Sequence, residues 1–433
     1  MAGLPVATTL DEAYLACDPD QPLPSGDSRW TDFSEGRGDD ATATLVRRFE
    51  ISGQRAPLHV AFFSHRGAGK TTELNRVGEQ LRRTAFTVYF EANTELDPNH
   101  LESEDLLLVI AQVVEERLRT AGMPLDEAIL ADVERWFVDQ VRTTSWARSL
   151  GLEASAGGGL GVPWFTRLAL DIKAAFRTQA EAREEIREVF RRKPSALVDA
   201  VNRVLDAANR RLRDSGRSLL IVIDNLDRYA PAIVDRLLVE RGALIDDLKT
   251  HMILTPPIAL LYKPHSESLA SRYDHEVMNT LRLRRPHDPY DAFDGPGRDL
   301  MVEALRRRMA VDALIPEPAV RDRLVAASGG AIRSLLHLIQ RSVLLSKGPV
   351  LVASAVDRAV ARERVQLRDQ VNLNGWAATL AWIQVHKQPS AEPASMDVLF
   401  HRLALKDNGE GWYDVHPLIA DLEELARARE ALG

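Results

Sequence analysis

A short glycine-containing loop between an apolar run and a helical pattern is the feature that most constrains the fold of this chain. Residues 58–63 (L-H-V-A-F-F) predict a buried strand, and the loop S-H-R-G-A-G-K-T follows at 64–71. Residues 70–83 have apolar positions at helical spacing, and residues 86–90 predict a second strand. Strand, loop, helix and strand at this spacing are typical of a βαβ unit. The sequence therefore predicts an α/β fold with a parallel sheet.

The loop carries the residue types that hold a nucleoside triphosphate. Gly67 and Gly69 let backbone N–H groups converge on phosphate, Lys70 can reach the β- and γ-phosphates, and Thr71 can hold Mg²⁺. The N-terminus of the following helix adds a dipole that favours anions. Ser64 stands where such a loop usually has its first glycine. The predicted ATP-binding residues of this segment are Ser64, His65, Arg66, Gly67, Ala68, Gly69, Lys70, Thr71 and Thr72.

A buried strand predicted later in the chain, at 219–223, ends in an acidic segment. Residues 219–223 are all aliphatic, and Asp224, Asn225 and Asp227 follow them. A carboxylate at the end of a strand beside the phosphate loop can hold Mg²⁺ through water, so we assign this role to Asp224. Because Asn225 cannot act as a base, the sequence predicts slow turnover. Asp227 could orient the attacking water instead, or it could only cap the next helix or pair with Arg228.

Three further residues are candidates for the site, and each has a plainer alternative. Thr255 follows a strand predicted at 252–254 and could contact the γ-phosphate or water, or serve only in a turn. Arg272 could act as an arginine finger on a neighbouring subunit, or lie on the surface. Arg333, in the segment S-G-G-A-I-R at 328–333, could reach back over the nucleotide, or face solvent.

The rest of the pattern is mainly helical. Helical spacing runs over 101–121, 125–147, 179–214, 297–347 and 351–365. A further strand is predicted at 276–283, and Asn408-Gly409 between two strand-like runs predicts a hairpin. Alternation on both sides of a glycine cluster predicts a second β-hairpin at 148–177. The predicted units are an irregular lead-in at 1–40, a P-loop ATPase domain at 41–290 with a helical and hairpin insertion at 98–215, a helical lid at 291–348 and a winged-helix-like domain at 349–433.

Composition is that of an ordinary globular protein, with 45% hydrophobic and 27% charged residues among 433. The net charge of -8 does not favour general attraction to nucleic acid. The single cysteine, Cys17, excludes an internal disulfide and a zinc site built on cysteines. Neither a signal peptide nor a run of eighteen apolar residues is evident, so we expect a cytoplasmic protein with no membrane partner.

These motifs, in this order, resemble the AAA+ and STAND classes of P-loop ATPases, in an origin-recognition-like or KAP-like branch, with a bacterial source. The resemblance is carried by S-H-R-G-A-G-K-T, by I-V-I-D-N-L-D-R at 221–228 and by S-G-G-A-I-R. The segment at 36–40, which contains Arg37, is similar to the adenine-side motif of these classes. The resemblance implies ATP and Mg²⁺ as ligands, a five-stranded parallel sheet, a helical lid that includes Arg333 and often a winged helix.

Two functions fit these predictions. The first is a nucleotide-dependent switch that self-associates and controls a protein effector, which the resemblance to bacterial STAND-like ATPases connects with signalling or phage defence. The second is a DNA-handling ATPase of the origin-binding or transposition-regulator type, with duplex DNA held by the winged helix. Asp407, Glu410 and Asp414 make the C-terminal hairpin a poor face for phosphate, so we favour the switch. A loop retained only as a structural relic is the third alternative.

Overall fold

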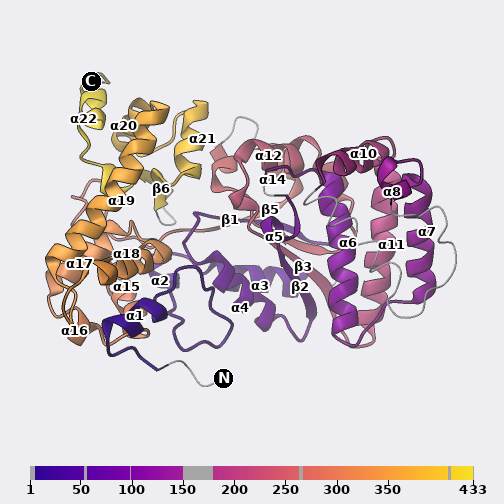
Figure 1. Cartoon of the computed structure of the whole chain (residues 1–433), viewed down its shortest axis with the longest axis horizontal. Coiled ribbons are helices and arrows are strands. Elements are labelled where there is room, and N and C mark those ends of the chain that lie inside the picture. Colours follow the sequence, from indigo (N-terminus) through magenta and orange to yellow (C-terminus); the bar gives the residue numbers. More distant parts are fainter. Residues whose placement is uncertain are drawn as a thin grey trace.

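The computed structural model describes residues 5–52, 56–97, 99–149, 179–262, 267–407 and 411–432, and it confirms the α/β fold. Figure 1 shows a central sheet with a group of long helices on one side and a second helical part, which holds the C-terminus, on the other. The first elements are α1 (Leu10–Ala16), α2 (Ser34–Arg37) and α3 (Ala41–Ser52). The lead-in therefore contains two short helices before α3.

The sheet has five parallel strands in the order β2-β3-β4-β1-β5. Their bounds are β1 (His59–Ser64), β2 (Ala85–Glu91), β3 (Ser218–Asp224), β4 (His251–Leu254) and β5 (Asp274–Met278). All of β3 except its first residue is buried, because helices cover both faces of the sheet, and this explains its unbroken aliphatic sequence. The segments that follow β1 and β3 emerge at the same edge of the sheet, where ligands of open α/β sheets bind.

Each face of the sheet has its own core, because successive side chains of a strand point to opposite faces. On one face, Val60 packs in a cluster with α3 and with α4 (Lys70–Gln80). On the other face, Phe63 belongs to a larger cluster with α6 (Ser103–Thr120) and α11 (Pro194–Arg213). The phosphate loop thus joins a strand to a helix that are both fixed by packing.

Beside the sheet lie the helices of the predicted insertion and those that connect the later strands. They are α5 (Ala92–Glu95), α7 (Glu127–Val141), α8 (Ser145–Ser149), α10 (Ala180–Arg191), η2 (Leu226–Arg228), α12 (Pro231–Asp235), η3 (Arg236–Glu240), α13 (Ala243–Asp246), η4 (Ile258–Tyr262) and α14 (Glu267–Arg272). The helical region predicted at 125–147 forms two helices, α7 and α8. It is split because the Thr144 hydroxyl donates to Val141 O at 2.7 Å and accepts from Ala147 N at 3.1 Å, which starts a new helix.

The second helical part follows the sheet. Its first group, which we call the lid helices, comprises α15 (Gly297–Arg306), α16 (Val311–Leu314), α17 (Pro318–Ala327) and α18 (Ile332–Leu345). The C-terminal unit comprises α19 (Ala353–Asn374), α20 (Ala377–His386), α21 (Pro393–Phe400), β6 (Ala404–Asp407), β7 (Trp412–Val415), η5 (Pro417–Ile419) and α22 (Glu423–Glu430). Over the described residues, no helix combines the length and apolar character needed to span a bilayer. The division into domains stays a prediction.

Two strand predictions can be compared with the structure. The strand expected at 276–283 is wrong beyond Met278, where β5 ends. The chain then leaves the sheet, because Leu281 N donates to Gly330 O at 3.1 Å and Arg282 N donates to Gly36 O at 2.9 Å. The C-terminal hairpin is confirmed, since β6 and β7 pair antiparallel, although its turn at 408–410 lies outside the described residues.

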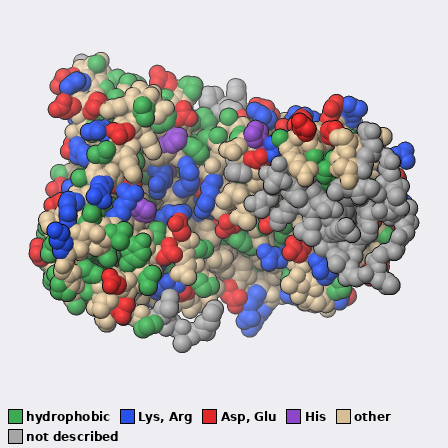
Figure 2. Space-filling model, viewed as in Figure 1, with side chains coloured by type: hydrophobic (Ala, Val, Ile, Leu, Met, Phe, Trp, Pro, Cys, Tyr) green, Lys and Arg blue, Asp and Glu red, His purple; other side chains and the backbone are tan. Residues whose placement is uncertain are grey.

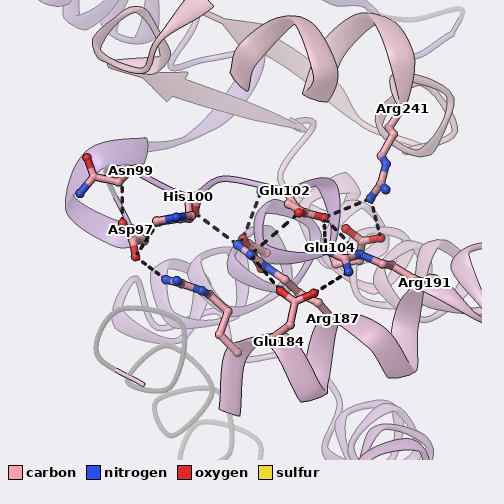
Figure 3. A network of polar contacts seen from close by, with 11 residues as sticks. Asp97, Asn99, His100, Glu102, Glu104, Glu184, Arg187, Arg191 and Arg241 are labelled. Carbon is pink, nitrogen blue, oxygen red and sulfur yellow. Dashed lines mark hydrogen bonds and ion pairs between the residues drawn. The ribbon is translucent and has the colours of Figure 1, made fainter. Parts of the chain in front are cut away.

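The β-hairpin predicted at 148–177 lies outside the described residues, except for its first two positions in α8. The chain is described again from residue 179, and α10 follows. A network of ion pairs holds α10 against the start of α6 (Figure 3). Arg187 donates to Asp105 at 2.9 Å, and Arg191 donates to Glu102 at 2.7 Å. Arg241, on the other side, also reaches Glu102 at 3.1 Å, so this carboxylate joins α10 to the segment after η3.

We predict that Arg187→Ala lowers the stability of the protein by about 3–5 kcal/mol, because it leaves the carboxylate of Asp105 buried without its charge partner. The side chains of Arg187 and Asp105 are only 4% and 2% exposed. Arg192→Ala is the matched control, since Arg192 and its partner Glu188 are 72% and 62% exposed and such a pair contributes about 0–1 kcal/mol. Chemical denaturation of both variants measures the difference, and equal losses would contradict the prediction.

Candidate functional site

The phosphate loop connects the end of β1 to the start of α4 at the ligand-binding edge of the sheet. Gly67 and Gly69 have φ angles of 88° and 102°, which L side chains rarely adopt. A Cβ atom on Gly67 would also lie 2.9 Å from Cβ of Arg333. Glycine is therefore required at Gly67 both for the backbone turn and for the close approach of α18.

Asp224, at the end of β3, is fully buried and accepts hydrogen bonds from three hydroxyl groups. Thr71 donates to Oδ2 at 2.6 Å, Tyr89 donates to the same atom at 2.9 Å, and Thr255 donates to Oδ1 at 3.1 Å. Burial and the nearby Asp224 carboxylate raise the pKa of Tyr89, so its hydroxyl stays protonated and can donate. Asp224 thus joins β2, β4 and the phosphate loop.

Lys70 and Asp227 form a second charged pair beside Asp224. Their Nζ and Oδ2 atoms are 2.5 Å apart, and each side chain is only 6% exposed. Asn225 has a φ of 64°, which turns the chain after β3 so that Asp227 in η2 lies opposite the lysine. The predicted catalytic acid is therefore in the site, and in this structure its carboxylate is held by the predicted phosphate-binding lysine.

Arg37, predicted from the lead-in, is buried against the loop. It donates to Ala68 O at 2.6 Å and to Glu73 Oε1 at 3.3 Å. Glu73 also accepts from Thr42 at 2.9 Å and from Arg76 at 2.8 Å, so this one carboxylate holds several segments together. Glu73 was not predicted from the sequence. The only available signal was an acidic residue in the first turn of the helix, which is common in helices and therefore unspecific.

The phosphate loop opens into a cavity that the lead-in closes on one side. Leu23 N donates to the Thr72 hydroxyl at 3.1 Å, which fastens the lead-in to α4. The cavity has an apolar part and a charged part, as a nucleotide with a flat base and a triphosphate requires. Its apolar lining is Pro22, Leu23, Trp30, Phe33, Ile332 and Leu336, and its charged lining includes Arg66, Lys70, Glu91, Asp227, Arg228 and Arg333. Trp30 and Glu91 were not predicted from the sequence.

The two remaining arginine candidates differ in position. Arg333 lies at the start of α18 and lines the cavity, and its backbone N–H donates to Gly67 O at 3.0 Å. Its guanidinium is paired with Asp20 of the lead-in. Arg272 does not line the cavity and pairs with Asp246 at 2.6 Å. Within one chain, Arg272 therefore lies at the surface, which was the alternative to an arginine finger.

The phosphate loop also contacts the C-terminal unit. Nε2 of His65 accepts a hydrogen bond from Lys406 N in β6 at 2.8 Å. Arg66 donates to Phe400 O at 2.7 Å, and its guanidinium lies 4.3 Å from the centre of the Phe400 ring. Two adjacent residues of the loop are thus bonded to the backbone on both sides of the connection between α21 and β6.

The site fits Mg²⁺ only together with phosphate oxygens. The described part of the chain has no group of three or more His, Cys, Asp or Glu side chains that could hold a metal ion. Thr71 lines the cavity, and its hydroxyl is directly bonded to Asp224. A hydroxyl and a carboxylate next to a lysine and a glycine loop are the donor set of a Mg²⁺–triphosphate site, in which the ligand supplies the other oxygens.

We predict a loss of stability in mild acid because of His65. Burial lowers the pKa of this histidine to about 3, from an ordinary value of 6.5. As the pH falls below 6.5 the unfolded chain takes up a proton that the folded chain excludes, so the free energy of unfolding falls by about 1.4 kcal/mol per pH unit. Between pH 6.5 and 5, the free energy of unfolding of His65→Asn should fall less steeply, because the contribution of His65 is removed. His287→Asn is the exposed control, and it should decline as the wild type does.

Comparison with known proteins leaves the family open. No protein-family model matches the chain, and no curated protein matches it in sequence. Among solved structures it is similar to the ORC1 protein of Aeropyrum pernix in complex with DNA, at 13% identity and a TM-score of 0.41 over 96% of both chains. It is also similar to a Walker-type ATPase of Pyrococcus abyssi, at 13% identity and a TM-score of 0.41 over 91% of this chain and 98% of that chain. The Cdc6p protein of Pyrobaculum aerophilum gives 12% identity and a TM-score of 0.37 over 96% of this chain and 98% of that chain.

Proposed function

We propose that this chain binds ATP with Mg²⁺ and hydrolyses it slowly, as an ATPase of the AAA+ type. One observation carries the proposal. Lys70, Thr71 and Asp227 line the cavity that the glycine loop opens into, and Asp224 is bonded to Thr71, with the Thr71–Asp224 and Lys70–Asp227 contacts at 2.6 and 2.5 Å. The four residues supply a cation for phosphate, two oxygen ligands for a metal and a carboxylate near the reacting group.

Each residue has a distinct task in this proposal. Lys70 leaves Asp227 and binds the β- and γ-phosphates, and the N–H groups of the loop surround them. Thr71 and Asp224 would hold Mg²⁺, which would neutralise charge on the phosphate oxygens. Asp227, once free of the lysine, can orient water and accept its proton as the water attacks the γ-phosphorus and the bond to the β-phosphate oxygen breaks.

Slow turnover follows from the same geometry. Asn225 lies directly after the metal-side aspartate, and an amide cannot accept the proton of the attacking water. Asp227 must first exchange its partner Lys70 for water, in a region where both side chains are buried. When ATP binds, Lys70 exchanges its contact with the Asp227 carboxylate for a contact with phosphate oxygens. Hydrolysis therefore depends on how strongly the phosphates attract the lysine.

A nucleotide-dependent switch is supported by the contacts between the loop and the C-terminal unit. His65 and Arg66 belong to the phosphate loop and are also bonded to Lys406 N and Phe400 O. A change in the loop on ATP binding therefore acts directly on α21 and β6. In this proposal the switch self-associates and controls a protein effector, in signalling or phage defence.

A DNA-handling ATPase is the second candidate, and one observation favours it. Asp414, part of the acidic hairpin face that counted against DNA, is only 2% exposed. It accepts from Lys387 at 2.6 Å and Tyr290 at 2.8 Å, and it is also paired with Arg284. Its charge is thus neutralised inside the protein and does not repel a phosphate backbone. The order α20, α21, β6 and β7 is the order of helices and hairpin in the predicted winged helix.

We predict that Lys70→Ala abolishes ATP hydrolysis and that Asp227→Asn lowers kcat by about a hundredfold or more, because a general base contributes about that much. Asp214→Asn, at a position 82% exposed, is the control and should keep the wild-type rate. Phosphate release is measured for all four proteins with and without duplex DNA. Turnover that survives in Lys70→Ala would exclude the loop as the active site, and turnover strongly raised by DNA would favour the second candidate.

We predict that ATP changes amide hydrogen exchange in α21 and β6, and that Arg66→Ala removes the change in α21. The arginine side chain is the link to Phe400 at the end of α21, whereas His65 still connects the loop to β6 in this variant. Arg82→Ala, 64% exposed near the end of α4, is the control and should respond to ATP as the wild type does. An unchanged response in Arg66→Ala, with ATP still bound, would contradict the transmission of the nucleotide state through this residue.

A further inference from the structure

A second cavity lies next to the nucleotide cavity, between the lid helices and the C-terminal unit. Its charged and polar lining is Asp20, Arg333, Ser334, His337, Glu363, Arg402 and His416. Asp20 and Arg333 line both cavities, and the ion pair between them separates the two. Arg402 and His337 line the second cavity and not the first, so the second cavity has residues of its own.

Arg402 is the unusual residue of this cavity. Its φ is 60°, a left-handed conformation that a residue with a long side chain rarely adopts. The side chain is partly buried, and in the part of the chain that the structure describes its guanidinium makes no hydrogen bond or ion pair. A partly buried cation without a partner is unfavourable unless an anion or water satisfies it. The strained backbone holds this cation at the cavity wall.

The charges around Arg402 leave the cavity positive. Burial and the nearby Arg66 and Arg333 lower the pKa of Arg402, and Glu363 offsets part of this effect. The two acidic residues of the lining are already paired, Asp20 with Arg333 and Glu363 with Arg341 at 2.6 Å. Figure 2 shows Lys and Arg side chains gathered across this face of the molecule, between the lid helices and the C-terminal helices. The cavity therefore lies within a local basic region of an acidic protein.

The donors of the cavity suit a tetrahedral oxyanion. Arg402 offers the planar fork of N–H donors that binds phosphate through two oxygens. Ser334 and His337, one turn apart along α18, add a hydroxyl and a ring nitrogen to the same lining. A carboxylate has two oxygens in one plane, whereas a phosphate presents three or more around a centre and can meet donors that come from different elements.

We propose that this cavity is a second binding site, distinct from the phosphate loop, for the phosphate group of a small phosphorylated ligand, with Arg402 as its principal contact. The cavity is bounded by α18, α19 and the segments on both sides of the hairpin, which suits one phosphate group better than a continuous backbone. Because Arg333 belongs to both cavities, a ligand here can compete with Asp20 for Arg333. A phosphate compound other than ATP can thereby change the contact between Asp20 and Arg333.

The test uses pyrophosphate as the probe in the full-length Lys70→Ala variant, in which the phosphate loop has lost its lysine. Titration calorimetry should still detect one pyrophosphate per chain. Adding Arg402→Gln should weaken this binding by about tenfold or more, the loss expected for one charge-assisted contact. Arg362→Gln is the matched control, since Arg362 is exposed on α19 and does not line the cavity. Thermal unfolding of each variant checks that the fold is retained.

Two results would overturn the proposal. One is the loss of all pyrophosphate binding in Lys70→Ala alone, which would leave only the phosphate loop. The other is unchanged pyrophosphate binding in a folded Arg402→Gln variant. His337→Asn is a second variant of the same cavity, and it should also weaken pyrophosphate binding. A short single-stranded oligonucleotide forms the second arm. Binding of the oligonucleotide that depends on Arg402, without binding of pyrophosphate, would also overturn the small-ligand proposal and assign the contact to a nucleic-acid backbone.

Discussion

The need to satisfy buried charge at one edge of the sheet organises this protein. Asp224 is an ionisable group with no exposed surface, and its carboxylate is satisfied there by the hydroxyls of Thr71, Tyr89 and Thr255, together with the backbone N–H of the next residue. These three donors come from the phosphate loop, β2 and the segment after β4, so their side chains are aligned by the sheet. The same requirement places Asp227 opposite Lys70. The charge pairs and hydrogen bonds that stabilise the fold therefore also hold the residues of the site in place.

The sequence could predict the parts of this site that depend on local pattern. A strand, a glycine loop and a helix identify Lys70 and Thr71, and an aliphatic run that ends in an acid identifies Asp224, because in each case the chemistry lies next to the signal along the chain. The parallel sheet followed from the same pattern. The strand predicted to continue past Met278 was wrong because a contact distant in sequence ends it. The helical region at 125–147 is two helices because a side-chain cap divides it.

The parts that could not be predicted depend on which strands and segments are neighbours. Tyr89 reaches Asp224 because β2 lies beside β3 with Glu91 opposite Asp224, and no local pattern shows this register. Glu73 matters because Arg37, Thr42 and Arg76 meet on it. The lead-in was expected to be irregular, yet it forms one wall of the cavity, since Leu23 bonds to both Thr72 and Asn75 of α4.

The contact between Asp20 and Arg333 joins residues that are 313 positions apart in the chain. Contacts between such distant segments form late in folding, because the chain between them must first become compact. Synthesis proceeds from the N-terminus, so the sheet and the phosphate loop leave the ribosome well before α18 does. During translation the chain therefore passes through a stage in which the glycine loop has folded but the wall above it is missing. The cavity is therefore completed only after α18 has been synthesised and has packed against the lead-in.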